Sequence, residues 1–312
     1  MPSLSQLIFG IGQAAALLLL APLVSSYSRV LRAKMHSRRG PGLLQDYHDI
    51  LKLLKRQEVL PPGSGLIFRA MPFMLMATLL LVAMSLPVLT FASPLDAVGN
   101  VFTFVYLMAF LRFFFALSGI DSGSVFAGIG ASREAAIGTL MEPTMLLALF
   151  VAALLAGSTN FSQISKSFGT MSGSSIAAEV AVMAAVTFAV FVEMSKAPYD
   201  MTEAEQEIQE GPLTEYSGPG LALLKWSVGL KQLVMATLLI GVFLPYGAAE
   251  SATTETLLWA ALPFAAKLVA VFVVVGLVET SFARHHILLS SRTTWAGFGI
   301  ATLALVFFVL GL

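Results

Sequence analysis

The sequence contains no cysteine and few charged residues. The absence of cysteine among 312 residues excludes a disulfide framework, a thiolate zinc site and an iron–sulfur cluster held by this chain alone. Only 12% of the residues are charged, about half the share of a typical soluble domain, while 57% are hydrophobic. This balance is too apolar for one globular core, so it indicates a membrane protein with several spans.

Other absences narrow the function further. The four histidines, at positions 36, 48, 285 and 286, form no helix-spaced metal motif, so we expect ordinary interfacial histidines and no metal or cofactor bound by this chain. No basic residue precedes the first apolar run, 7–24, which argues against a cleavable signal peptide. The 18 acidic and 18 basic residues cancel, so overall charge suggests no nucleic-acid partner.

The apolar residues are arranged in long segments. A helix needs about 20 mainly apolar residues to cross a bilayer. We therefore expect an all-α integral membrane protein with about eight spans in a single domain, 1–312. The expected spans are 4–26, 71–92, 99–118, 134–157, 176–196, 222–247, 255–280 and 293–312.

Lysine and arginine are distributed unequally between alternate loops. Nine follow the first span: Arg29, Arg32, Lys34, Arg38, Arg39, Lys52, Lys55, Arg56 and Arg69. Others flank the third, fifth and seventh loops: Arg112, Arg133, Lys196, Lys225, Arg284 and Arg292. The opposite loops contain only Lys166. The positive-inside rule therefore predicts that the odd-numbered loops are cytoplasmic and that both termini lie outside.

The first loop, 27–70, is long and contains an amphipathic pattern. Leu43, Tyr47, Ile50 and Leu54 follow helical spacing, and basic residues lie off that stripe. An ordinary surface helix bound to anionic lipid would show this pattern. Acidic residues at 46 and 49 favour instead the docking of a soluble subunit.

Several charged residues fall within or beside the apolar segments, where burial is costly. Glu193 and Lys196 are spaced to pair on one helix, whereas Glu142 and Lys267 have no partner nearby in the sequence. One hypothesis is a proton-conducting path, and the alternative is a set of polar contacts that bind the helices together. The candidates are Glu134, Glu142, Glu193, Lys196, Glu203, Glu205, Glu207, Glu210, Lys231, Lys267 and Glu279.

The fifth loop, 197–221, is strongly acidic. Residues 199–218 contain six acids and no lysine or arginine. Thr202-Glu203-Ala204-Glu205 fits a helix-starting capping box, and Gly211-Pro212 should end that helix. Glu203, Glu207 and Glu210 would then share one face with no local base to relieve them. A solvated acidic surface, a basic partner and proton-carrying acids all remain open.

Three motifs carry a resemblance to a known family. "RRGPGLLQDYHDILKLLKRQ" at 38–57, "GASREAAIGTLMEP" at 130–143 and "APYDMTEAEQEIQEGPLTEYSG" at 197–218 resemble, in order, the eight-helix membrane subunit shared by complex I and membrane-bound [NiFe] hydrogenases. The resemblance covers essentially the whole chain. "QEGP" within the acidic loop, and "MHSRRGPG" at 35–42, resemble the formate hydrogenlyase or hydrogenase-4 branch.

The resemblance implies a membrane subunit of the bacterial inner membrane that anchors a soluble arm and couples its redox chemistry to proton or ion movement. Partner subunits would carry the [NiFe] centre and the iron–sulfur clusters, and antiporter-like membrane subunits would lie beside this chain. The residues expected to dock the soluble arm are Arg38, Arg39, Gly40, Pro41, Gln45, Asp46, Asp49, Lys52, Arg133, Asp200, Glu215 and Tyr216.

Two other functional classes stay open. One is the proton-translocating, quinone-binding subunit of a respiratory NADH-quinone oxidoreductase, although the departure in the acidic loop weighs against quinone binding. The other is a stand-alone ion transporter, against which the long first loop and the missing inverted repeat both argue.

Overall fold

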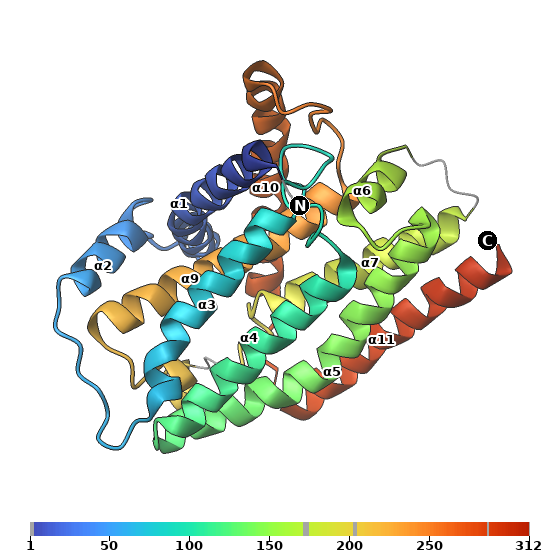
Figure 1. The fold of residues 1–312 in the computed structure, drawn as a ribbon. Coiled ribbons are helices and arrows are strands. Elements are labelled where there is room, and N and C mark those ends of the chain that lie inside the picture. The colour runs from blue at the N-terminus through green and yellow to red at the C-terminus, as the bar shows by residue number, and fades with distance from the viewer. Residues whose placement is uncertain (1–2, 171–174, 202–204, 286, 312) are drawn as a thin grey trace.

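A computed structural model describes residues 3–170, 175–201, 205–285 and 287–311. Over these residues the chain is a bundle of helices (Figure 1), eight of which are long and apolar enough to cross a membrane. This confirms the expected all-α class and the number of spans. The eight are α1 (Leu4–Met35), α3 (Leu66–Ser85), α4 (Val101–Asp121), α5 (Val125–Ala156), α7 (Ile176–Glu193), α9 (Gly218–Leu238), α10 (Thr254–Ser281) and α11 (Ile287–Leu310).

Shorter elements connect them. The helix α2 (Gln45–Leu54) lies in the first loop, α6 (Phe161–Thr170) precedes α7, and α8 (Glu205–Ile208) and the 3₁₀ turn η1 (Gly211–Leu213) lie in the acidic loop. The π-helix η2 (Leu239–Phe243) continues α9 directly.

Several helix boundaries differ from the sequence-based expectation. Helix α1 continues to Met35 and α5 begins at Val125, several residues outside the expected spans, because hydropathy marks the apolar part of a helix and not its ends. Helix α3 is displaced toward the N-terminus, to Leu66–Ser85. Leu86 is extended there because the following Pro87 disfavours helical backbone at the residue before it.

The helices pack around α9, the most buried of the eight. Helix α9 contacts α1, α3 and α7, while α5 contacts α4, α7 and α11. In Figure 1, α3, α4, α5 and α11 run alongside one another, and α10 stands at a steep angle to them. Helix α10 has few buried residues and packs mainly against α1. Each of the helices α4, α5, α7 and α9 turns at least one charged side chain toward a common interior.

The loops gather at two ends of the bundle. At one end, called here the loop-one end, the first loop meets the acidic loop, where Val59 hydrogen-bonds to Ser217. At the opposite end, the segments after α3, α5 and α9 meet through bridges between Thr90 and Ala249 and between Asn100 and Asn160. Alternate loops thus share an end, as eight successive spans require.

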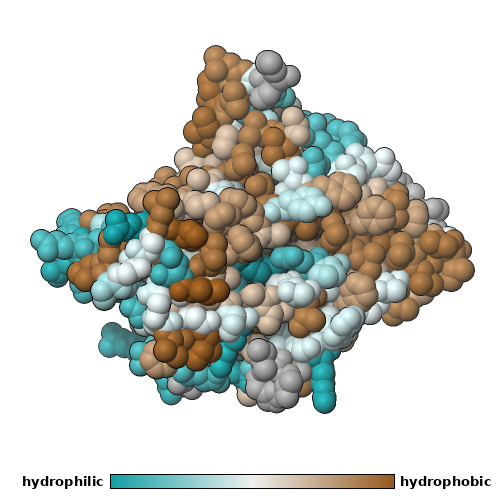
Figure 2. All heavy atoms as spheres, turned by 60° about the horizontal axis from the view of Figure 1, so that its bottom comes forward, coloured by the Kyte–Doolittle hydropathy of each residue, from teal (hydrophilic) through white to brown (hydrophobic). Residues whose placement is uncertain are grey.

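The outer surface is largely apolar between these ends. Large apolar side chains on the outside include Ile8, Tyr106, Phe113, Trp259 and Trp295, each more than half exposed. Figure 2 turns the lower part of Figure 1 forward and shows hydrophilic residues interspersed there with apolar ones, whereas the lobe at the top is mostly hydrophobic. Such a surface suits a hydrocarbon environment.

Candidate functional site

A buried arginine lies at the centre of a charged cluster. Arg112, in the middle of α4, has a side chain that is only 8% exposed. Its Nε lies 3.5 Å from Glu134 Oε1, its Nη1 donates to Glu142 Oε1 at 2.6 Å, and its Nη2 donates to Glu193 Oε1. Lys231 Nζ lies 3.5 Å from the other oxygen of Glu193. We call these five residues the ion cluster.

Four helices supply the ion cluster, and a glycine makes room for it. Arg112 comes from α4, Glu134 and Glu142 from α5, Glu193 from the end of α7, and Lys231 from α9. The guanidinium crosses α5 at Gly138, where an added Cβ would lie 2.2 Å from Arg112 Cδ. A glycine at this position therefore allows Arg112 to reach both acids of α5.

The cluster is unbalanced in charge. Three carboxylates face two bases, so the fully ionised cluster carries one net negative charge, which uptake of one proton would cancel. Each charge costs roughly 2.5–3.5 kcal/mol at the centre of a membrane helix on insertion scales. Pairing offsets part of that cost, but a buried ion pair is weak evidence for stability by itself. An arrangement of this kind can hold or exchange a proton.

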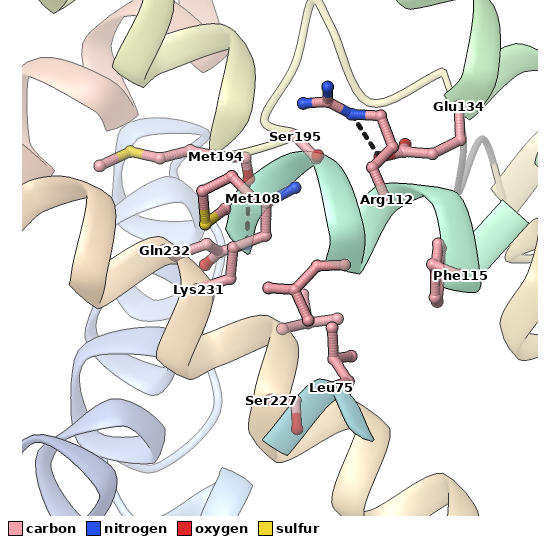
Figure 3. Close-up of a pocket in the computed structure, with 12 residues that line it drawn as sticks. Leu75, Met108, Arg112, Phe115, Glu134, Met194, Ser195, Ser227, Lys231 and Gln232 are labelled. Atoms are coloured by element: carbon pink, nitrogen blue, oxygen red, sulfur yellow. Dashed lines mark hydrogen bonds and ion pairs between the residues drawn. The ribbon is translucent and has the colours of Figure 1, made fainter. Parts of the chain in front are cut away.

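Small cavities adjoin the cluster (Figure 3). One, of about 40 Å³, is lined on its polar side by Arg112, Glu134, Ser195, Lys231 and Gln232. Figure 3 shows Arg112 and Glu134 on one side of it and Lys231 and Gln232 on another. Two cavities of about 10 Å³ extend from the same residues, one toward Glu142 and one toward the acidic loop. A buried water needs roughly 10–15 Å³, so these spaces suit single waters or short chains of them.

Four of the predicted proton-path residues thus come together: Glu134, Glu142, Glu193 and Lys231. The predicted pairing of Glu193 with Lys196 is wrong, because Glu193 pairs with Arg112 and Lys231 instead. Helix α7 ends at Glu193, and Ser195 has a φ of 51°. The chain therefore turns away before Lys196 can take its place one helical turn later.

Two other candidates, both on α10, have partners outside the ion cluster. Lys267 Nζ donates to the carbonyl oxygen of Leu244, at 2.5 Å, and to that of Tyr246. These carbonyls follow the end of η2, where a helix leaves acceptors unsatisfied and carries partial negative charge. Glu279 lies 3.9 Å from Arg32 of α1.

The acidic loop gains bases from distant parts of the chain. Asp200 pairs with Arg284 at 2.8 Å, Glu207 with Arg133 at 2.7 Å, and Glu210 with Lys225 at 3.6 Å. The acidic loop therefore contains no base of its own, but bases from other elements pair with three of its acids.

The predicted helix of the acidic loop is shorter than expected. Helix α8 ends at Ile208, and the positive φ of Gln209 and Glu210 takes Glu210 off the helix. The expected face shared by Glu203, Glu207 and Glu210 is therefore wrong for Glu210. Thr202 and Glu203 lie outside the described residues, as does the side chain of Glu205.

Burial also changes titration in this loop. Asp200 is largely buried, which raises the pKa of its carboxyl, and the nearby Arg284 offsets only part of that effect. Burial likewise raises the pKa of Tyr216.

The predicted docking residues divide into exposed and internally engaged groups. Arg38, Arg39 and Lys52 are exposed at the loop-one end. The others are engaged within the chain. Gly40 lies against α1, Gln45 donates to Asp49, and Asp46 pairs with Arg29 at 2.5 Å. Arg133 and Asp200 form the ion pairs described above, Pro41 and Glu215 are half-buried, and Tyr216 is buried.

The amphipathic stripe of the first loop is only partly buried. Ile50 is buried in α2, whereas Leu43 and Leu54 are about half exposed.

Sequence reasoning missed Arg112. We counted it among the loop residues that set orientation, yet it lies eleven residues into an apolar helix. That position was the available signal, because an intramembrane arginine is rare and needs partners. Gln232, which lines the largest of the three cavities and donates to the Met194 carbonyl at 3.3 Å, carried no signal in the sequence.

Comparison with known proteins finds relatives along nearly the whole chain. The chain is 51% identical to hydrogenase-4 component C of Escherichia coli over 98% of its length and 96% of that protein's. It is 50% identical to formate hydrogenlyase subunit 4 of the same organism, over 94% and 96% of the two chains. NADH-quinone oxidoreductase subunit 8 of Rhodothermus marinus is 29% identical over 73% of this chain and 71% of that protein.

A solved structure shares the fold. One chain of the membrane-bound sulfane sulfur reductase, an archaeal respiratory membrane complex, superposes with a TM-score of 0.83 at 19% identity, covering 97% of this chain and 99% of that one. The family model described as NADH dehydrogenase matches residues 9–310. With these relatives along nearly its whole length, the chain belongs to the NADH dehydrogenase family of membrane subunits.

Proposed function

We propose that this chain is the membrane subunit of a formate hydrogenlyase-type hydrogenase complex, which anchors a soluble redox arm and couples its chemistry to proton movement. The names of the two E. coli relatives, which are 51% and 50% identical to this chain, support the hydrogenase branch. Large and small [NiFe] subunits, iron–sulfur proteins and antiporter-like membrane subunits are the partners this role requires. The chain itself holds no redox group in this proposal.

The loop-one end faces the cytoplasm of a bacterial inner membrane in this proposal. The unequal distribution of lysine and arginine supports that orientation. Exposed Arg38, Arg39 and Lys52 at this end offer positive charge to an acidic surface of the arm. Salt would weaken such contacts, because exposed charges are screened.

The ion cluster carries the coupling part of the proposal. Water-sized cavities lie on both sides of Arg112, one lined by Ser195 and Tyr199 on the acidic-loop side and one lined by Glu142 of α5. A proton entering from the loop-one end would be taken up by the net negative cluster and released at Glu142. Arg112 and Lys231 would hold the three acids in place during this exchange.

Glu142 marks the lateral exit of this path. Its side chain is 38% exposed, whereas those of Glu134 and Glu193 are below 10%. An exposed acid within a spanning helix must face water or another polar group, because hydrocarbon would make its charge costly. An antiporter-like neighbour covering this face of α5 would supply that group.

Amide substitutions test the path. Glu142→Gln and Glu193→Gln keep size and hydrogen bonding but cannot titrate, so the complex should assemble while turnover slows or loses its response to an uncoupler. Glu250→Gln, at an exposed acid of the opposite end, is the control and should change neither. The measurement records hydrogen evolution and membrane potential together in vesicles containing each variant.

The opposite result is equally clear. If both amide variants assemble with the wild-type rate and the wild-type response to uncoupler, the ion cluster is a structural contact between helices. The proton path is then excluded.

A further inference from the structure

Two segments far apart in the sequence are joined at the loop-one end. The backbone N–H of Val59 donates to Ser217 Oγ at 2.7 Å, and that hydroxyl donates to the carbonyl oxygen of Val59 at 2.9 Å. Ser217 is the residue before α9, where serine would ordinarily cap the helix with its own side chain. Here it makes no such cap, because its hydroxyl is committed to the first loop.

Two glycines allow the backbones to approach. Gly218 has a φ of 51°, and an added Cβ would lie 2.7 Å from the carbonyl oxygen of Gln57. At Gly220 an added Cβ would lie 2.5 Å from Glu58 Oε1. The Glu58 carboxylate therefore lies over the first turn of α9, where free N–H groups and the helix dipole favour negative charge.

An aromatic pair fastens the far side of the same joint. The rings of Tyr216 and Phe68 stack with centroids 3.9 Å apart and an interplanar angle of 9°, and the Tyr216 hydroxyl donates to the Phe68 carbonyl oxygen at 2.9 Å. Asp121 of α4 in turn accepts from the Phe68 N–H at 2.9 Å. The first loop is thus held at 57–59 and again at Phe68, on both sides of its exposed turn.

We propose that residues 216–220, together with 57–59 and Phe68, form a clasp that transmits attachment of the soluble arm to the ion cluster. The inference rests on the proposed function, since it concerns how the arm reaches the proton path. The first loop contains the exposed basic residues offered to the arm, and α9 carries Lys231. The clasp joins the two directly.

The route from the clasp to the cluster is a single rigid element. Helix α9 runs without interruption from Gly218 through Lys231, a distance of roughly 20 Å at 1.5 Å per residue. Glu210 of the acidic loop pairs with Lys225 on the same helix. A displacement of the first loop therefore moves the start of α9, and with it the contact between Lys231 and Glu193.

Two substitutions open the clasp without touching the ion cluster. Ser217→Ala removes both hydrogen bonds to Val59, and Gly218→Ala places a methyl group against the Gln57 carbonyl. Gly63→Ala is the matched control, because Gly63 also has a positive φ, of 88°, but nothing lies within 4 Å of an added Cβ. This control separates the effect of alanine at a positive φ from the effect of losing the contact between 57–59 and 217–218.

The whole complex in vesicles is the system to measure. With both clasp variants, the arm should stay bound and hydrogen uptake with a soluble electron acceptor should stay normal. Membrane potential formed per hydrogen evolved should fall about fivefold or more, the lower range of coupling between linked sites. Amide hydrogen–deuterium exchange should become faster in peptides covering 55–60 and 217–226. Gly63→Ala should change neither the membrane potential nor this exchange.

A crosslink provides the reverse test, because the native chain has no cysteine. In a Val59→Cys, Ser217→Cys variant, a short bis-maleimide should restore the membrane potential that the uncrosslinked variant loses, with each single cysteine variant as control. Faster exchange with unchanged coupling, or a crosslink that restores nothing, would overturn the clasp as a coupling element. A wild-type complex that forms no membrane potential at all would overturn the clasp together with the proposed function. Glu142→Gln and Glu193→Gln variants that behave as wild type would identify that case.

Discussion

Substitution of Gly138 by alanine should displace Arg112 without changing any charge. The added Cβ would lie 2.2 Å from Arg112 Cδ and 2.9 Å from Nη1. Restoring ordinary contact at 3.4 Å to Cδ requires a shift of about 1.2 Å away from α5. Glu134 and Glu142 are both on α5, so that shift separates the guanidinium from both acids.

The expected loss of stability follows from these distances. The contact between Nη1 and Glu142, now 2.6 Å, would lengthen beyond hydrogen-bonding range. Overpacking costs about 1–3 kcal/mol and a lost charged hydrogen bond about 1.5–3 kcal/mol, while alanine returns about 1 kcal/mol as a better helix former. The net destabilisation is roughly 1.5–5 kcal/mol, which for a chain of this size lowers Tm by about 2–8 °C.

Gly128→Ala is the matched control on the same helix. Nothing lies within 4 Å of an added Cβ at Gly128, so alanine there should be neutral or slightly stabilising. The assay heats the detergent-purified complex and follows the fraction of this chain that stays soluble. If Gly138→Ala proves as stable as Gly128→Ala, Arg112 is not held against α5 and the described ion cluster is incorrect.

Three further outcomes are expected. Burial raises the pKa of Asp200, so the folded chain binds a proton more readily than the unfolded chain. The wild type should therefore gain stability relative to Asp200→Asn as the pH falls from about 7 toward the ordinary pKa of 3.8. Thermal unfolding at several pH values measures this, and a wild type that loses stability relative to Asp200→Asn over that range would contradict it. Replacing Arg38 and Arg39 with alanine should release the soluble arm at lower salt while membrane insertion stays normal, and an arm that stays bound in high-salt washes would contradict the docking role. Lys267→Met leaves the two carbonyls that follow η2 without their donor, which should cost about 1–3 kcal/mol, whereas Lys267→Arg should recover part of that loss in the same heating assay.

The sequence by itself determined the class of the protein and its spans. A run of about 20 apolar residues has few alternatives to a membrane helix, because backbone groups in hydrocarbon must be satisfied within the segment. The same argument identified Glu134, Glu142, Glu193 and Lys231 as unusual, since each places a charge where burial is costly. Motifs then indicated the family, and the relatives confirmed it.

Pairing of these charges was decided by the tertiary structure. Local spacing favoured Glu193 with Lys196, but a helix end and a positive φ at Ser195 removed that geometry. The true partners, Arg112 and Lys231, are 81 and 38 positions away in the chain. Contacts at such separations depend on which helices are neighbours, and hydrophobic periodicity carries no record of that.

The same reason explains the acidic loop and the clasp. The sequence shows six acids without a base, yet Arg284, Arg133 and Lys225 arrive from other elements. Ser217 fits the pattern of a helix cap, but its hydroxyl is taken by a loop 158 positions away. Composition sets the cost of each buried or clustered charge, and only the packing of the helices decides which group offsets it.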